Sequence, residues 1–176
     1  MNRARLLSLC AVFLLAGSSL FAVPTAKWES PEITLGTPKA TILKTLGNPD
    51  TTDTGTEIYL ISDSPELLMG MVEYKNDKVS VYGQIYKPDV TLQRLKEKLK
   101  AKGLSPLSEN EEATVYFTKM PNSDLEYYIV LSPTNESTTG PGVANMTKEA
   151  FTEAEQQEKD EKGNASESAA PEKPQN

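Results

Sequence analysis

The stretch "MGMVEYKNDKVSVYGQIY" constrains the fold more than any other part of the chain, because it predicts a β-hairpin. Residues of high strand propensity alternate with others on both sides of the Asn-Asp pair at residues 76–77, which can form a two-residue turn. In this register Tyr74 pairs with Val79 and Val72 pairs with Val81, so these four side chains share one face of a sheet. An isolated hairpin is only marginally stable, so further strands or helices must cover that face.

Three other segments predict additional strands, namely "TEIYLIS", "ATVYFTKM" and "LEYYIVLS". Two segments instead have apolar residues at helical spacing between start and stop signals. In the first, Thr37 can cap the helix, Pro38 suits its first position and Gly47 can end it. In the second, Asp89 can cap a helix with three leucines at i, i+3 and i+7, which ends at Gly103.

The order helix, strands, helix, strands predicts an α+β domain in which two short helices pack on an antiparallel sheet of four or five strands. The stretches "LKTLGNPDTTDTGTEIYLI" and "LKAKGLSPLSENEEATVYFT" share the order helix end, glycine, proline, acidic loop and strand. A duplicated helix-plus-hairpin unit would explain this order. We favour two independent helix-to-strand connections that use the same turn residues.

The two ends of the chain differ in composition from its middle. Residues 1–26 begin with two arginines, continue with an apolar run and end with small residues, as a secretory signal peptide does. Residues 27–146 have the length of one ordinary domain. Residues 147–176 are acidic and lack Val, Ile and Leu, so we expect a flexible tail. The alternative is a solvated helix that is capped by Thr147 and ends near Gly163, with disorder beyond it.

Removal of the signal peptide would make the protein periplasmic or secreted, whereas an uncleaved signal would anchor it in the membrane. The single cysteine, Cys10, lies early in the apolar run, so we expect no lipid anchor and a mature chain without cysteine. Peripheral association with the envelope stays open. Loss of Arg3 and Arg5 lowers the formal net charge from -7 to -9, which disfavours a nucleic-acid or anionic-membrane partner.

The segment "GTPKATILKTLGNPD" resembles the recurring element of the small lipoproteins of the outer-membrane protein assembly machinery, the SmpA/OmlA type, and of the related β-lactamase inhibitor proteins. The residues that carry the resemblance are Gly36, Thr37, Ile42, Leu46, Gly47 and Pro49. The resemblance implies a non-catalytic cell-envelope module whose sheet and loops bind other proteins, with structural roles for Gly36, Thr37, Leu46, Gly47 and Pro49. This chain departs from the lipoproteins because a cysteine at the end of the apolar run is missing.

The chain has no histidine, which removes the usual general base, metal ligand and triad member. "NPDTTDTGTE" brings Asp50, Asp53 and Glu57 close together, as in a calcium loop or a carboxylate pair, but its spacing does not match an EF-hand. We favour a polar turn and expect no catalytic residue, metal or cofactor. We therefore interpret the chain as a protein-interaction module. The alternative is a periplasmic small-ligand-binding protein or a carboxylate-based hydrolase.

Tyrosines in the predicted hairpin are the candidates for a contact surface. Tyr82 and Tyr86 lie on the face opposite Val79, Val81 and Ile85 if the alternation is unbroken. When the valines pack against the helices, both tyrosines face outward, where they bury much area at little entropic cost. We predict that Tyr82 and Tyr86 contact another envelope protein, which is not identified. The alternative is that they cover a half-exposed sheet face or belong to a core on the other side.

Overall fold

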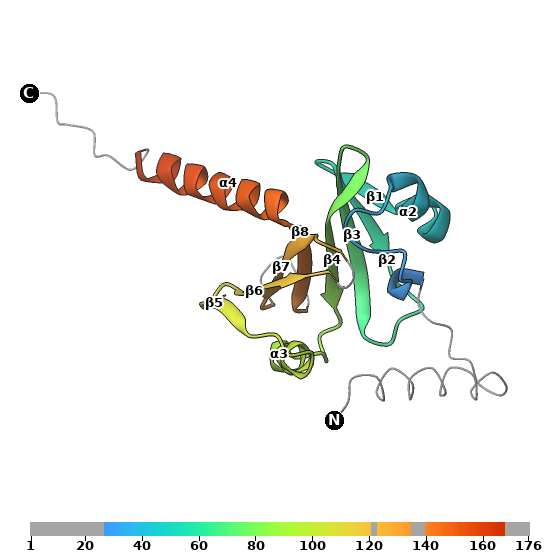
Figure 1. Ribbon diagram of the computed structural model, residues 1–176, viewed down its shortest axis with the longest axis horizontal. Helices are drawn as coiled ribbons and strands as arrows, with labels where there is room; N and C mark the ends of the chain where they lie inside the picture. Colours follow the sequence, from blue (N-terminus) through green and yellow to red (C-terminus); the bar gives the residue numbers. More distant parts are fainter. Residues whose placement is uncertain (1–26, 121–122, 135–139, 168–176) are drawn as a thin grey trace, which may run out of the picture.

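The computed structural model describes residues 27–120, 123–134 and 140–167, so the predicted signal peptide and the end of the acidic tail lie outside the described residues. The described residues form one short 3-10 helix, three α-helices and eight strands (Figure 1). The elements are η1 (Lys27–Glu29), α2 (Lys39–Leu46), β1 (Thr51–Asp53), β2 (Thr56–Leu60), β3 (Leu67–Lys75), β4 (Lys78–Tyr86), α3 (Leu92–Ala101), β5 (Pro106–Glu109), β6 (Thr114–Lys119), β7 (Glu126–Ser132), β8 (Gly142–Thr147) and α4 (Lys148–Glu167).

All eight described strands belong to one antiparallel sheet in the order β1-β2-β3-β4-β8-β7-β6-β5. The prediction of two helices on four or five strands is therefore wrong. A helix followed by four strands occurs twice along the chain, and the last strands of the two runs, β4 and β8, pair in the middle of the sheet. The prediction missed β8, whose sequence "GVANMT" has few β-branched residues, and it missed the short edge strands β1 and β5.

Helix α2 starts slightly later than predicted. Pro38 precedes the helix in an extended conformation, and the Thr37 hydroxyl donates a hydrogen bond to the Glu32 carbonyl at 2.9 Å instead of capping the helix. The helix ends as predicted, because Gly47 has a φ of 89° and its N–H donates to the Leu43 carbonyl at 2.9 Å. A glycine is required there, since other residues rarely adopt this φ.

Helix α3 is capped by a different residue from the one predicted. The hydroxyl oxygen of Thr91 accepts a hydrogen bond from the Arg94 N–H at 3.2 Å, so Thr91 rather than Asp89 is the N-cap. Leu95 is buried, as expected for the apolar stripe of an amphipathic helix. Gly103 follows the helix with a φ of 82°, in agreement with the predicted stop signal.

The predicted hairpin forms between β3 and β4, but its register changes after one pair. Both residues of the turn at 76–77 have positive φ, and Tyr74 pairs with Val79 as predicted. The next pair is Glu73 with Val81, which leaves Ser80 as an extra residue on β4. Ser80 is therefore a β-bulge, and its hydroxyl donates to the Glu73 carbonyl at 3.3 Å.

The bulge determines which side chains of β4 face the helices. Val72 pairs with Tyr82 rather than with Val81, so the second predicted pair is wrong. Directly opposite residues share a face of the sheet. Tyr82 and Tyr86 consequently lie on the face of Val72, and Val81 and Ile85 lie on the opposite face.

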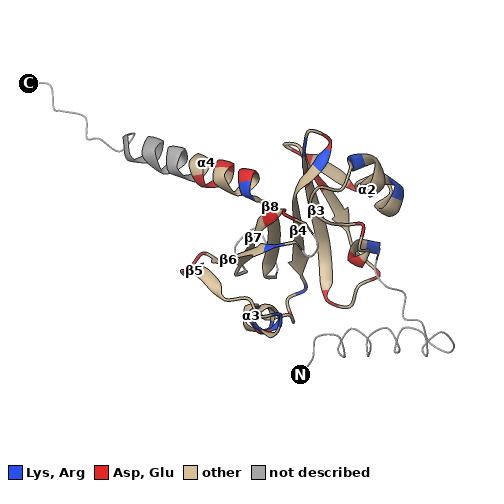
Figure 2. Cartoon of the chain, in the orientation of Figure 1, with Lys and Arg blue, Asp and Glu red and all other residues tan. Residues whose placement is uncertain are grey.

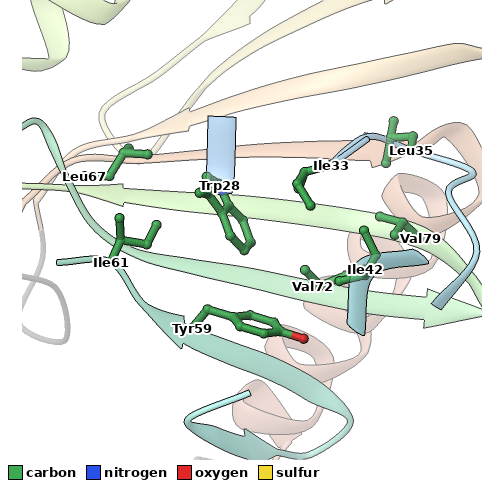
Figure 3. Packing of buried hydrophobic residues seen from close by; sticks show 9 residues of the cluster. All are labelled: Trp28, Ile33, Leu35, Ile42, Tyr59, Ile61, Leu67, Val72 and Val79. Carbon is green, nitrogen blue, oxygen red and sulfur yellow. The ribbon is translucent and has the colours of Figure 1, made fainter. Parts of the chain in front are cut away.

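The main core lies on one face of the sheet, which we call the helix face. One row of paired residues crosses the sheet on this face: Val72, Tyr82, Asn145, Ile129 and Tyr116. A first cluster joins the segment before α2, α2 itself and β2 to β4 (Figure 3), and it comprises Trp28, Ile33, Leu35, Ile42, Tyr59, Ile61, Leu67, Val72 and Val79. A second cluster joins α3 to β6 and β7, and it comprises Val90, Leu95, Tyr116, Ile129 and Leu131.

Candidate functional site

The two tyrosines predicted to contact a partner line a cleft on the helix face. The expectation that they face outward is wrong, because the bulge in β4 turns them toward the helices. The cleft has a volume of about 300 Å³, and α3, β4, β7 and β8 contribute its walls. Tyr82, Tyr86 and Tyr127 lie around it together with apolar side chains of α3, and Tyr127 is partly buried against both core clusters. The structure therefore brings the predicted residues together in a concavity.

The polar groups of the cleft include tyrosine hydroxyls that can form hydrogen bonds. The Tyr86 hydroxyl donates to Gln84 Oε1 at 3.1 Å. Burial raises the pKa of Tyr82 to about 12, helped by the neighbouring Tyr127, and burial likewise raises the pKa of Tyr86 to about 12. Both hydroxyls are therefore protonated at neutral pH and can donate hydrogen bonds.

Asn145 is one of four polar residues of the cleft that sequence reasoning missed, and the others are Gln84, Lys98 and Lys102. Asn145 lies in β8, paired with Tyr82 on one side and Ile129 on the other, and it is 8% exposed. Within the parts of the chain that the structure describes, no hydrogen bond joins its side-chain amide to another protein group. The sequence did not place this residue beside the tyrosines, because β8 itself was not predicted as a strand.

A second polar cluster surrounds Glu57, which is 5% exposed. Its carboxylate accepts hydrogen bonds from the Tyr59 and Tyr74 hydroxyls, both at 2.8 Å, and Lys39 Nζ lies 2.6 Å from its other oxygen. Burial opposes ionisation of Glu57, but Lys39 and the two hydroxyls outweigh burial and hold its pKa below the usual value. Because Lys39 is the first residue of α2, this cluster fastens the helix to the sheet.

The three acids of the predicted polar turn do not form a common site. Glu57 is buried in β2, whereas Asp53 is exposed in β1. Asp50 Oδ2 accepts a hydrogen bond from the Leu60 N–H at 2.7 Å. In the described ranges, no group of three or more Asp, Glu, His or Cys residues is arranged to hold a metal ion.

Several residues of the "GTPKATILKTLGNPD" segment have structural positions. The Gly36 N–H donates to the Val79 carbonyl at 2.8 Å, and the Val79 N–H donates to the Thr37 carbonyl at 2.9 Å. These bonds join the segment to the start of β4. Leu46 is partly buried against the first core cluster, and Pro49 is partly buried after Gly47.

The opposite side of the sheet, which we call the open face, carries many apolar side chains. By the strand register its members are Ile58, Leu60, Met69, Met71, Val81, Ile85, Val115, Phe117, Tyr128, Val130, Ala144 and Met146. Leu60 is 64% exposed and Phe117 is 39% exposed. The alternation pattern did not predict this surface, since it assigned Val81 and Ile85 to the helix-covered side.

Helix α4 packs on one part of the open face and then leads away from the sheet (Figure 1). The Phe151 ring stacks on Tyr128 with a centroid distance of 4.0 Å and an interplanar angle of 14°. Lys75 Nζ lies 2.8 Å from Glu149 and 2.5 Å from Glu153. The start of the acidic tail is thus a packed helix, and α4 continues past the predicted end near Gly163.

Comparisons with protein-family models, with curated proteins and with solved structures find no match for this chain. The resemblance to outer-membrane assembly lipoproteins therefore stays a prediction. None of the helices in the described ranges is long and apolar enough to cross a membrane.

Proposed function

We propose that this protein is a non-catalytic binding protein of the bacterial cell envelope that recognises another protein through the open face of its sheet. The observation that carries the proposal is the exposure of Leu60 (64%) beside the partly buried Ile58, Met69 and Met71 on the same face. Phe117 (39%) lies on this face too, with four strands between it and Leu60. Contiguous exposed apolar surface is typical of interaction sites. Methionine side chains adapt to the shape of a partner because they are long and unbranched.

The polar residues at the margin of the open face favour a protein as the partner. Glu73 and Glu126 share this face with Lys119, so the face carries charges of both signs beside its apolar residues. Protein interfaces combine an apolar core with a polar rim of this kind. A nucleic-acid-binding surface would instead be predominantly basic.

Residues 1–26 and the resemblance of the segment around α2 support a location in the envelope. We expect cleavage after about residue 26 and a periplasmic or secreted mature protein. Cell fractionation combined with mass measurement of the purified protein tests this part. An intact N-terminus in the membrane fraction would contradict it.

Two leucines of equal exposure provide a matched test of the open face. Leu60 lies on the open face and is 64% exposed, whereas Leu107 lies on the edge strand β5 and is 65% exposed. A photo-crosslinking amino acid at position 60 should capture a discrete partner in intact cells, and the same group at position 107 should not. Met71→Glu should abolish capture at position 60, because it places a charge in the apolar centre.

Two results would contradict binding through the open face. Equal capture at positions 60 and 107, or capture that persists in the Met71→Glu variant, would refute binding through the open face. Circular dichroism of each variant shows whether it is folded, so that loss of capture through unfolding can be recognised. A carboxylate-based hydrolase has no comparable support, because Glu57, the buried carboxylate of the described chain, is engaged by Lys39 and two tyrosines.

A further inference from the structure

We propose that the cleft on the helix face binds a small organic anion with an apolar body, as a function additional to protein binding on the open face. The cleft lies on the other side of the sheet from Leu60 and Phe117. Its volume of about 300 Å³ is at the lower end of the range of ligand pockets. The ligand must therefore be small.

The walls of the cleft are suited to an apolar body. Leu99 and Leu104 approach from α3 and the residues after it, and Val143 lies opposite them on β8. All three side chains are only partly buried, so the apolar surface of the cleft stays accessible. An apolar ligand group would remove this surface from water, which is favourable in proportion to the area buried.

The Asn145 side chain is an independent indication of a ligand. It is 8% exposed and lines the cleft, yet in the described structure its amide makes no hydrogen bond to protein. Among the described residues, only Trp28 Nε1 is a fully buried side-chain polar atom without a hydrogen-bond partner, so the Asn145 amide reaches solvent in the cleft and is accessible to a ligand. A ligand with an acceptor oxygen would pair with the Asn145 NH₂ group.

The other polar groups of the cleft are mainly hydrogen-bond donors. Tyr82 and Tyr127 line the cleft, and burial raises the pKa of both, so both hydroxyls are protonated at neutral pH. Gln84 Oε1 already accepts from the Tyr86 hydroxyl, which leaves the Gln84 NH₂ group as a donor. In the described residues no carboxylate lines the cleft. This arrangement favours an anionic head group over a cation.

Helix α3 adds positive charge to a chain whose formal net charge is -7. It has four basic residues and one acidic residue, and Lys102 follows as its C-cap. Figure 2 shows basic residues in blue on this helix. Lys98 and Lys102 line the cleft. The nearby Glu66 pairs with Arg94 at 2.6 Å and with Lys98 at 2.7 Å. Lys102 has no carboxylate within ion-pair distance in the described chain, so it can pair with a bound anion.

Octanoate is a suitable probe because it combines a carboxylate with a short apolar chain. Titration of the purified ¹⁵N-labelled protein, followed by NMR, should shift the side-chain NH₂ signals of Asn145 and Gln84 in a saturable manner. Octanol should bind at least about fivefold more weakly, since it cannot pair with the lysine. Absence of saturable shifts, or equal affinity for octanol, would overturn the proposal.

Two lysines on the same part of the chain provide a matched pair of variants. Lys102 lines the cleft, whereas Lys100 is exposed on α3 and does not. Lys102→Gln should raise the Kd for octanoate roughly two- to fivefold, and Lys100→Gln should leave it unchanged. Equal effects of the two variants would show that binding depends on general charge and not on the cleft.

Asn145→Ala tests the specific hydrogen bond and should raise the Kd for octanoate about tenfold. Crosslinking at position 60 should persist in this variant, because the open face is unchanged. The two proposals can therefore fail separately. Unchanged octanoate affinity in a folded Asn145→Ala protein would contradict the assignment of the cleft.

Discussion

The contact between Trp28 and Gly70 holds the segment before α2 on the sheet. Trp28 belongs to η1, is 3% exposed and lies next to Tyr59 and Ile61 (Figure 3). A Cβ atom placed on Gly70 would lie 2.4 Å from three carbons of the indole ring. Real Cβ contacts are not this short, so the side chain at position 70 must be a hydrogen atom for the indole to pack on β3.

The substitution Gly70→Ala should therefore destabilise the protein by about 1–3 kcal/mol, because the rigid indole must move or β3 must bend. Removal of the ring in Trp28→Ala should cost about 3–5 kcal/mol. In the Trp28→Ala background, however, the new methyl group of Gly70→Ala contacts no indole ring. The substitution should then stabilise the protein by about 0.4–1 kcal/mol, because alanine lowers the conformational entropy of the unfolded chain. The coupling energy between the two substitutions is then about 1.4–4 kcal/mol.

Urea unfolding followed by far-ultraviolet circular dichroism measures all four proteins of this cycle. Trp28 is the single tryptophan of the chain, so its emission reports directly on the indole in the Gly70→Ala variant. We expect a red shift as the ring moves toward water. An unchanged midpoint and unchanged emission in Gly70→Ala, or the same effect in both backgrounds, would refute the close contact.

Three further substitutions test other contacts. Glu57→Gln should destabilise by about 1.5–3 kcal/mol at neutral pH. The folded pKa of Glu57 lies below its ordinary value of 4.5, so ionised Glu57 stabilises the fold above pH 4.5, and this stabilisation is lost as the pH falls through the folded pKa. The urea midpoint of Glu57→Gln should therefore depend less on pH below 4.5 than the midpoint of the unsubstituted protein. Phe151→Ala removes the stack on Tyr128 and should speed amide exchange in α4 about fivefold, with sheet amides as the internal control. Gly47→Ala forces a φ of 89° on alanine and should destabilise by about 1 kcal/mol, measured as a lower Tm.

Features that depend on local turn chemistry were predictable from the sequence. The stop signals at Gly47 and Gly103 fall where α2 and α3 end, and the turn at residues 76–77 pairs Tyr74 with Val79 as expected. In each case two to four adjacent residues decide the backbone conformation. Sequence patterns contain this information without knowledge of the rest of the fold.

Features that depend on distant partners were not predictable in the same way. β8 lies in the middle of the sheet because β4 and β7 pair with its two edges, and its own sequence has little strand propensity. Trp28 precedes every predicted element and lies in no periodic pattern, although it is central to the first core cluster. Asn145 belongs to β8, so the polar centre of the cleft was missed together with the strand.

The bulge at Ser80 had the largest effect on the candidate sites, because a shift of one residue moves every following side chain to the other face. The residues on both sides of Ser80 alternate regularly, and a serine is also a common outward-facing residue, so no local signal marked it as an extra residue. It places Tyr82 and Tyr86 beside α3, where they form the cleft, and it places Val81 and Ile85 with Met71 on the open face. Both proposed binding surfaces therefore depend on the same bulge, and without it the open face would carry Tyr82 and Tyr86 and the cleft would lose their hydroxyls.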